Sequence, residues 1–377
     1  MGKVTVDRAA ETLPLPSKDG GGKGGGADDR PRGLVARVKG FLKRHKTLFW
    51  WLHSFYALFL GFMVILFAQK GFDHARVLAA TLGGALLGML VLFRIFGQGA
   101  AQKEKVEASR GSKLRFLIFT YVLKNLYQPM LFFVLPFYWK ASSLDSVNGW
   151  FIFVMGLLAL LSTMDLIFDH FLMRHRVWAS VYYGLTLFAC VNLVLPAFLP
   201  NLRTVVTLGS SAAIAVLGFF ALHFPFSALR EKKTWAILAV AVTVFSGGVV
   251  LARRGIPPVP LYLQHAAVGP ELLPDGRLAV EVSVVHVSKL NDLYAVTDVA
   301  LPGGEGDDFV HVWRFKDGDF VMETKTDRVE GAPKGAVRLR STMPHAALPA
   351  SPAGRWTVDV QTADGQLVGR ARFEVIE

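Results

Sequence analysis

Long apolar runs fill the first two thirds of the chain, and short alternating runs replace them in the last third. A helix needs about 20 predominantly apolar residues to cross a hydrocarbon core about 30 Å thick. Runs of this kind predict seven membrane-spanning helices within residues 47–254: Leu48–Ala68, Val77–Phe96, Leu114–Trp139, Gly149–Leu172, Val177–Leu199, Val205–His223 and Thr234–Ala252. Because the connections between them are short, neighbouring spans are expected to form antiparallel hairpins.

The last third of the chain has the pattern of a β domain. Residues 255–262 are rich in proline and predict a stiff spacer. Within residues 263–377, alternating runs rich in Val, Thr and aromatic residues predict the strands Leu278–Val287, Leu293–Ala300, Phe309–Phe315, Phe320–Val329, Ala336–Arg340, Arg355–Thr362 and Gln366–Ile376. About seven short strands in roughly 120 residues are typical of an immunoglobulin-like sandwich. The predicted fold is therefore an α-helical polytopic membrane bundle followed by an all-β, immunoglobulin-like sandwich.

Two further segments precede the first predicted span. Residues 1–29 are rich in glycine and have almost no large apolar side chains, a composition that predicts a disordered tail. Residues 30–46 carry basic side chains between apolar ones at helical spacing. They predict an amphipathic helix that lies on the bilayer surface and contacts anionic lipid.

The net charge of +12 is divided unevenly along the chain. Residues 257–377 hold 12 Lys and Arg against 17 Asp and Glu, whereas residues 1–256 hold 29 against 12. The positive charges lie beside the ends of the apolar runs, where they set membrane orientation, so the pattern argues against a nucleic-acid partner. The positive-inside rule places the N-terminus in the cytoplasm, and an odd number of spans then places the C-terminal domain in the periplasm. Arg253 and Arg254, which follow the last span, argue against this orientation.

The sequence offers no recognised metal or cofactor site, and no cofactor is expected. Cys190 is the only cysteine, so the chain can form neither an internal disulfide nor a zinc site built on several thiolates. His286, His311 and His345 do not have the spacing of metal ligands. The acidic segment 303–308 lacks the ligand spacing of a calcium loop, so a solvated turn is the better interpretation of it.

A set of polar residues interrupts the third and fourth predicted spans: Lys124, Asn125, Gln128, Asp165, Asp169 and His170. Ionisable side chains inside a membrane are costly unless they are paired, and they are functional candidates for that reason. One interpretation is a proton- or cation-coupled site that opens to the cytoplasm. The other is a Lys124–Asp165 pair that locks two helices together, which is the commoner role of such pairs.

A second set of residues resembles a known family. The elements lie mainly in the β domain: His311, Trp313 and Arg314, then Gly354, Trp356 and Asp359, then Gly365 and Gly369. This pattern resembles an uncharacterised proteobacterial inner-membrane protein family with a C-terminal periplasmic domain of unknown function. The stretches Leu135–Trp139 and Ser162–Asp165 are similar to the membrane half of one subgroup. The resemblance implies a Gram-negative inner-membrane location and supplies no activity.

Together these features predict a multi-pass membrane protein with a binding role rather than a catalytic one. The expected function is the presentation of a periplasmic β-sandwich to an envelope protein or a glycan. The alternative, from a different class, is a transporter or membrane enzyme that uses the intramembrane Lys and Asp residues.

Overall fold

The computed structural model describes residues 83, 84, 88, 128–164, 168, 176–223, 230–303 and 305–377. By its contacts the chain divides into Met1–Trp51 and Leu52–Glu377, and every described residue belongs to the second unit. The predicted tail, the amphipathic segment 30–46, the first predicted span and most of the second lie outside the described residues. The same holds for residues 114–127 of the third span.

The described helical part consists of residues 128–141, α6 (Gly149–Thr163), α8 (Arg176–Phe198), α9 (Thr204–His223) and α10 (Lys232–Leu251). Within the described part of the chain, three helices are long and apolar enough to cross a membrane: Val177–Phe198, Thr204–Ala221 and Lys232–Leu251. These match the fifth, sixth and seventh predicted spans to within a few residues. The structure does not show the full count of seven.

The fourth predicted span differs from the structure, because the helix expected over Gly149–Leu172 ends at Thr163. The side chains of Ser162 and Thr163 donate hydrogen bonds to the carbonyls of Ala159 and Leu160, 2.5 and 2.7 Å away. Met164 then adopts an extended conformation, with φ −94° and ψ 93°. Serine and threonine compete in this way with the helical ladder. The apolar pattern continues past Met164 and conceals this helix end.

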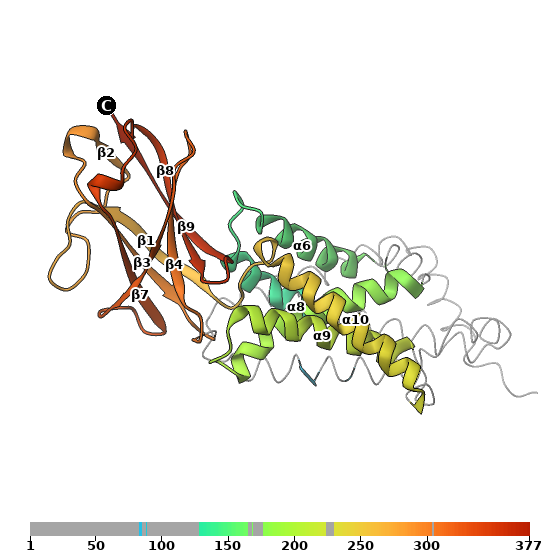
Figure 1. The fold of residues 1–377 in the computed structure, drawn as a ribbon. Coiled ribbons are helices and arrows are strands. Elements are labelled where there is room, and N and C mark those ends of the chain that lie inside the picture. The colour runs from blue at the N-terminus through green and yellow to red at the C-terminus, as the bar shows by residue number, and fades with distance from the viewer. Residues whose placement is uncertain are drawn as a thin grey trace, which may run out of the picture. The chain divides into compact units, whose positions relative to one another are not determined.

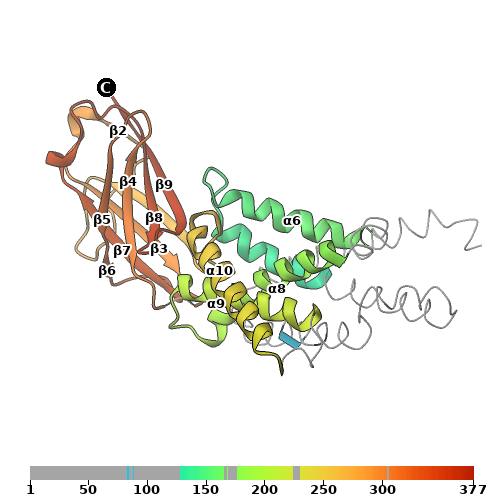
Figure 2. The same cartoon turned by 45° about the vertical axis from the view of Figure 1, so that its right-hand side comes forward.

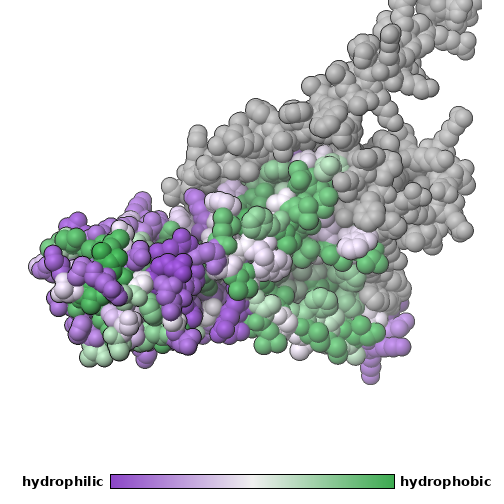
Figure 3. Space-filling model, turned by 90° about the horizontal axis from the view of Figure 1, so that it is seen from above, coloured by the Kyte–Doolittle hydropathy of each residue, from purple (hydrophilic) through white to green (hydrophobic). Residues whose placement is uncertain are grey.

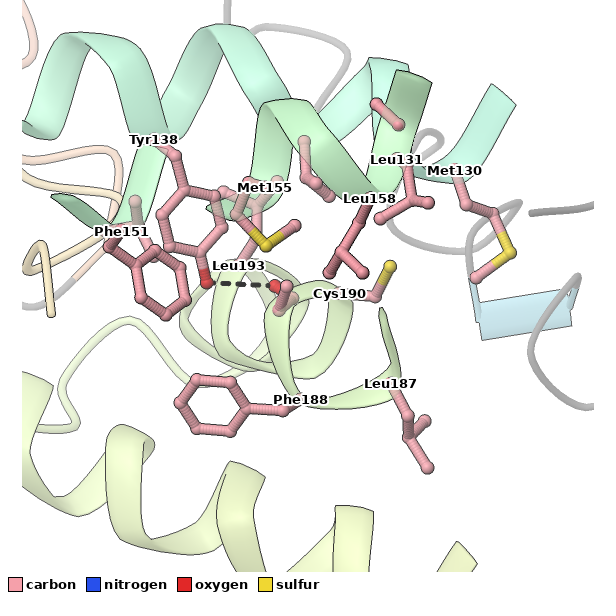
Figure 4. Close-up of a cluster of buried hydrophobic side chains, with 14 of the residues drawn as sticks. Met130, Leu131, Tyr138, Phe151, Met155, Leu158, Leu187, Phe188, Cys190 and Leu193 are labelled. Atoms are coloured by element: carbon pink, nitrogen blue, oxygen red, sulfur yellow. Dashed lines mark hydrogen bonds between the residues drawn. The ribbon is translucent and has the colours of Figure 1, made fainter. Parts of the chain in front are cut away.

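The helices pack around a core that Figure 4 shows in close-up, with Met155 and Cys190 at its centre. Tyr138, which is completely buried, donates a hydrogen bond to the carbonyl of Ala189, 3.2 Å away. The amide of Asn192 in turn donates to the Tyr138 hydroxyl at 3.2 Å. This short polar chain joins residues 128–141 to α8 inside an otherwise apolar core.

Large apolar side chains also cover the outside of the helices, as the green surface in Figure 3 shows. The outer face of α10 is the clearest case, with Val240, Val244 and Phe245 exposed. Four tryptophans near helix ends are more than half exposed: Trp139, Trp150, Trp178 and Trp235. Exposed apolar surface of this extent is unfavourable in water and is typical of contact with lipid, and tryptophan is enriched at membrane–water interfaces.

The C-terminal part forms two packed sheets, which Figures 1 and 2 show from two directions. The four-stranded sheet has the order β1 (Tyr262–Gly269), β3 (Leu293–Ala300), β7 (Ala336–Met343), β6 (Asp327–Val329). The five-stranded sheet has the order β2 (Val284–His286), β9 (Leu367–Ile376), β8 (Gly354–Thr362), β4 (Phe309–Phe315), β5 (Val321–Lys325). Strand β2 is parallel to β9, and the other neighbours are antiparallel.

The sandwich core contains two apolar clusters, both built from the two sheets. The larger holds Trp313 and Trp356, both essentially inaccessible, with Phe373 against each of them. Between facing sheets, the buried imidazole of His311 is hydrogen-bonded to Thr297 at 2.9 Å and Ser341 at 2.7 Å. Burial lowers the pKa of His311 to about 4. The imidazole is therefore neutral at physiological pH and joins the two sheets.

Strands β3 and β4 have the predicted bounds, but three other regions differ. The run Leu278–Val287 supplies only the short β2, and Phe320–Val329 divides into β5 and β6, which belong to different sheets. Strand β1 was not predicted. Its central residues Gln264, His265 and Ala266 are polar or small, and a register shift between Leu263 and His265 interrupts the alternation that marks a strand.

Candidate functional site

The structure tests little of the intramembrane polar set. Gln128 is buried at the start of the described helix 128–141. The other members, Lys124, Asn125, Asp165, Asp169 and His170, lie outside the described residues. The choice between a coupled site and a structural pair therefore stays a prediction.

Most of the β-domain signature has a structural role. His311, Trp313 and Trp356 form the centre of the sandwich, and the Trp356 indole donates to the carbonyl of Pro352 at 2.8 Å. Gly354 and Gly365 have φ of +137° and +85°, a region that L side chains rarely adopt.

Gly369 is needed for a close approach of β1 to β9. A Cβ atom at this position would lie 2.6 Å from the Cβ of Leu263. The glycine therefore lets the two sheets meet at this end of the sandwich.

The last two signature residues belong to a charged network on the outer face of the five-stranded sheet. Asp359 is buried and accepts hydrogen bonds from Arg314 at 3.1 Å and from Arg370 at 3.0 Å, the latter also bonding through its Nε. Arg370 then donates to Asp145 at 2.8 Å, and Arg372 donates to the same carboxylate at 2.6 Å. Asp145 lies in the loop 142–148, between helix 128–141 and α6. The network thus connects the sandwich to the helices.

The electrostatics of Asp145 reflect this position. Its partial burial on its own would raise the pKa of the carboxyl group, but the hydrogen bonds from Arg372 and Arg370 outweigh that effect and leave the pKa below its usual range. The carboxylate is therefore ionised at physiological pH. Arg370 is almost fully buried between the two carboxylates, whereas Arg372 is exposed.

A second ionic contact lies at Asp364, in the turn between β8 and β9. Arg203, in the loop 199–203 between α8 and α9, donates to its carboxylate at 2.9 Å. The side chain of Arg253, directly after α10, donates to the backbone carbonyl of Asp364 and to that of Val250. The charge of Arg253 argues against the predicted orientation, but the structure gives this side chain partners within the protein.

A third contact places a carboxylate of the sandwich at the N-terminus of α9. Asp307 accepts hydrogen bonds from the Thr204 backbone N–H at 3.0 and 3.2 Å and from its hydroxyl at 3.2 Å. Carboxylates at this position satisfy unpaired helix N–H groups and the helix dipole. Burial nevertheless raises the pKa of Asp307 to about 6. The expected solvated turn is thus wrong for Asp307, which is 1% exposed.

The proline-rich segment completes the connection. Ile256 and Val259 are buried in the helical core, and Leu261 is buried in the sandwich core. The side chain of Gln366 donates to the Ile256 carbonyl at 3.2 Å, and that of Asn148 donates to the Leu367 carbonyl at 3.1 Å. The segment predicted as a stiff spacer is therefore packed on both sides.

We call these contacts the seam: the loops 142–148, 199–203 and 252–261 on the helical side, and the residues of β8, β9 and the segment 301–308 that they touch. Backbone groups approach closely there, since Glu305 donates its N–H to the Pro200 carbonyl at 2.8 Å. A Cβ on Gly306 would lie 2.2 Å from the carbonyl oxygen of Asn201. The seam includes a cap, two ionic networks and a continuous backbone.

Sequence reasoning identified Arg314 and Asp359 but missed Asp145, Asp307, Asp364 and Arg370. Their partners on the other side of the seam lie between 103 and 227 residues away along the chain, so no local spacing indicates them. The one available signal was the presence of single charges in short loops between apolar runs, which was interpreted only as a sign of membrane orientation.

Comparison with known families agrees with the expectation of an uncharacterised family. A model described as "Family of unknown function (DUF5924)" matches residues 31–295, and one described as "Protein of unknown function (DUF2914)" matches residues 307–375. The first match runs through the helices and β1 and β2 into β3, and the second spans β4 to β9. A search of curated proteins found no match. The first match covers more than half of the chain, so the chain belongs to the family of unknown function DUF5924.

Proposed function

We propose that this protein is a multi-pass protein of a bacterial inner membrane that holds an immunoglobulin-like sandwich against the periplasmic ends of its helices. The sandwich binds an envelope protein or a glycan and catalyses no reaction. The observation that carries the proposal is the seam, because a domain capped, ion-paired and packed onto three loops is held in one orientation. A fixed orientation serves a binding surface, since it removes part of the ordering cost of association.

The distribution of charge supports the orientation. Arg176, Arg230, Lys232 and Lys233 lie at the helix ends remote from the seam. At the seam, Arg203 and Arg253 contact Asp364 and are less available to set orientation. The positive-inside rule, applied to the remaining charges, places the remote end in the cytoplasm.

Strand order supports the immunoglobulin-like description. The orders β1-β3-β7-β6 and β9-β8-β4 correspond to the ABED and GFC sheets of that fold. Trp313 lies on β4, the counterpart of the strand that carries the core tryptophan of antibody domains. Ala295 on β3 and Val358 on β8 share its cluster, on the two strands that antibody domains join by a disulfide.

Cysteine labelling tests the orientation. Cys190 is buried in the helical core and should not react, so labelling of a single cysteine introduced at an exposed site can be measured over this background. We expect Glu323→Cys, on β5, to react with a membrane-impermeant maleimide in cells whose outer membrane is permeabilised. We expect Lys232→Cys to react only after the inner membrane is broken, and the reverse pattern would overturn the orientation.

Photo-crosslinking in intact cells tests the binding function. A photoreactive residue in place of Val321, which is exposed on the edge strand β5, is expected to form a recurrent adduct with one envelope component. The same residue in place of Val240 on α10 is the control and should give only lipid adducts. If further exposed positions around the sandwich also give no protein or glycan adduct, the binding function is wrong.

A further inference from the structure

A hairpin between β1 and β2 crosses the outer face of the four-stranded sheet. We call residues 270–283 the strap. Its two arms pair at Leu272 and Leu278, and its tip turns at Gly276, with φ +76°. A Cβ on Gly276 would lie 2.3 Å from Val329 of β6, and one on Gly269 would lie 2.2 Å from the Val280 carbonyl at the base. The strap is thus held at both ends, at β1 and at β6, across β3 and β7.

A cavity of about 270 Å³ lies beneath the middle of the strap. Val296 of β3 and Arg338 of β7 form its floor, and the strap contributes Leu273, Leu278, Arg277 and Glu281, with His265 of β1 beside them. The pocket opens to solvent at its rim, where His265 and Glu281 are exposed. The volume is just below the range of about 300–1,000 Å³ typical of drug-sized ligands, which favours a smaller metabolite.

Arg338 is oriented for a ligand by a buried partner. Its Nε and Nη2 donate to the two oxygens of Asp298 at 2.8 and 2.9 Å, and both residues are more than nine-tenths buried. A guanidinium has five N–H donors, so this bidentate contact uses one edge of the group. An arginine fixed in this way can receive a second carboxylate on its remaining edge at little entropic cost.

Glu281 supplies the opposite charge. One of its oxygens lies 2.9 Å from Nε2 of His265, and its side chain is 58% exposed. A carboxylate has about four lone-pair positions, so the contact with His265 leaves capacity for an ammonium group.

The balance of charge selects among ligand classes. Asp298 neutralises Arg338, and Asp275 neutralises Arg277 through a bond from its Nε at 2.6 Å. Glu281 adds one further carboxylate to this balance, beside His265. A simple anion would therefore gain little net attraction, and a simple amine would leave the donors of Arg338 unused. A zwitterion offers a carboxylate to Arg338 and an ammonium group to Glu281.

We infer that this cavity binds a free α-amino acid with an aliphatic side chain. Its carboxylate contacts Arg338, its ammonium group contacts Glu281, and its side chain packs against Leu273, Leu278 and Val296. The seven lining residues lie outside the seam and outside β5, where the partner of the sandwich is tested above, so a failure of either proposal leaves the other standing.

Calorimetric titration of the purified full-length protein in detergent micelles tests the inference. The probe is L-leucine, and N-acetyl-L-leucine and L-leucinamide are the analogues that lack the ammonium and carboxylate charges. We expect saturable binding of L-leucine and at least roughly tenfold weaker binding of each analogue. An absence of saturable binding at ~10 mM L-leucine, or equal binding of all three compounds, would overturn the inference.

Two variants locate the binding. Glu281→Gln is expected to weaken L-leucine binding by at least roughly tenfold, whereas Glu323→Gln, an equivalent change on β5, should leave it unchanged. Val296→Phe fills the cavity floor without changing charge and should abolish binding, with the near-ultraviolet circular dichroism checking the fold. If L-leucine binds Glu281→Gln and a folded Val296→Phe as well as it binds the parent protein, the cavity is not the site.

Discussion

The pH dependence of the seam follows from one buried carboxylate, that of Asp307. Its pKa rises from 3.8 to about 6, chiefly because burial disfavours the charged form. The hydrogen bonds from Thr204 oppose this rise and do not cancel it. The docked state therefore binds the proton of Asp307 more tightly than an undocked state in which the carboxyl group faces water.

The sign and size of the effect are set by linkage. A raised pKa contributes stability that is fully present below pH 3.8 and is lost as the pH rises through about 6. One pKa unit corresponds to about 1.4 kcal/mol, so the full effect is at most roughly 3 kcal/mol. Asp307→Asn keeps an oxygen that accepts from the Thr204 N–H and removes the charge. At neutral pH we therefore expect it to stabilise the docked state by up to that amount.

Hydrogen exchange measured by mass spectrometry reports the stability of the docked state locally, in peptides that cover the loop 199–203 and the first turn of α9. After correction for intrinsic exchange rates, protection in the parent protein should fall between pH 4 and 7 by up to roughly a hundredfold. Asp307→Asn should flatten that profile, and Asp308→Asn, a change at the exposed neighbour, should not. If Asp307→Asn instead lowers protection at neutral pH, the ionised carboxylate is a favourable cap and the burial argument is refuted.

Three further predictions concern the sandwich and the seam. Burial lowers the pKa of His311 to about 4, so the free energy of unfolding of the sandwich should fall by up to roughly 3 kcal/mol as the pH falls from 6.5 to 4. His311→Gln should remove this loss in acid titrations followed by circular dichroism. Asp145→Asn removes the ion pairs to Arg370 and Arg372 and should destabilise the docked state by only about 1 kcal/mol, because partly exposed pairs are screened by water. High salt should reduce the difference in hydrogen exchange between the variant and the parent protein. Gly369→Ala should lower the thermal midpoint of the sandwich by the equivalent of about 1–3 kcal/mol, since its Cβ meets Leu263, and an unchanged midpoint would show that β1 can move aside.

The sequence was sufficient where one local pattern determined the structure. Strands β3 and β4 were predicted with their observed bounds, because each is a short run rich in Val and aromatic residues with turn residues on both sides. Helices α8 to α10 were predicted because apolar runs of that length have few other folds. The end of α6 was missed because serine and threonine hydroxyls end it while the apolar pattern continues.

The seam could not be predicted, because it depends on pairs that are distant in sequence. Asp145 and Arg370 are 225 positions apart, and each on its own has the pattern of a solvated charge. The proline-rich segment shows that amino-acid composition alone does not determine whether a segment packs against the rest of the protein. Its prolines indicate a stiff spacer, but Ile256, Val259 and Leu261 between and beside them are apolar, and it is these residues that pack into the two cores.

Because of the seam, the full-length protein and an isolated sandwich fragment should differ in their binding properties. The match to the first family ends at residue 295, inside β3, so β1, the strap and β2 are matched together with the helices and apart from β4 to β9. A fragment that starts at residue 257 would expose Arg370 without Asp145 and Asp307 without Thr204, and would leave Leu261 at a frayed end. Its binding properties would then reflect a surface that the intact chain covers. A partner that binds the fragment and not the full-length protein should therefore be attributed to the exposed seam rather than to the outer surface of the sandwich.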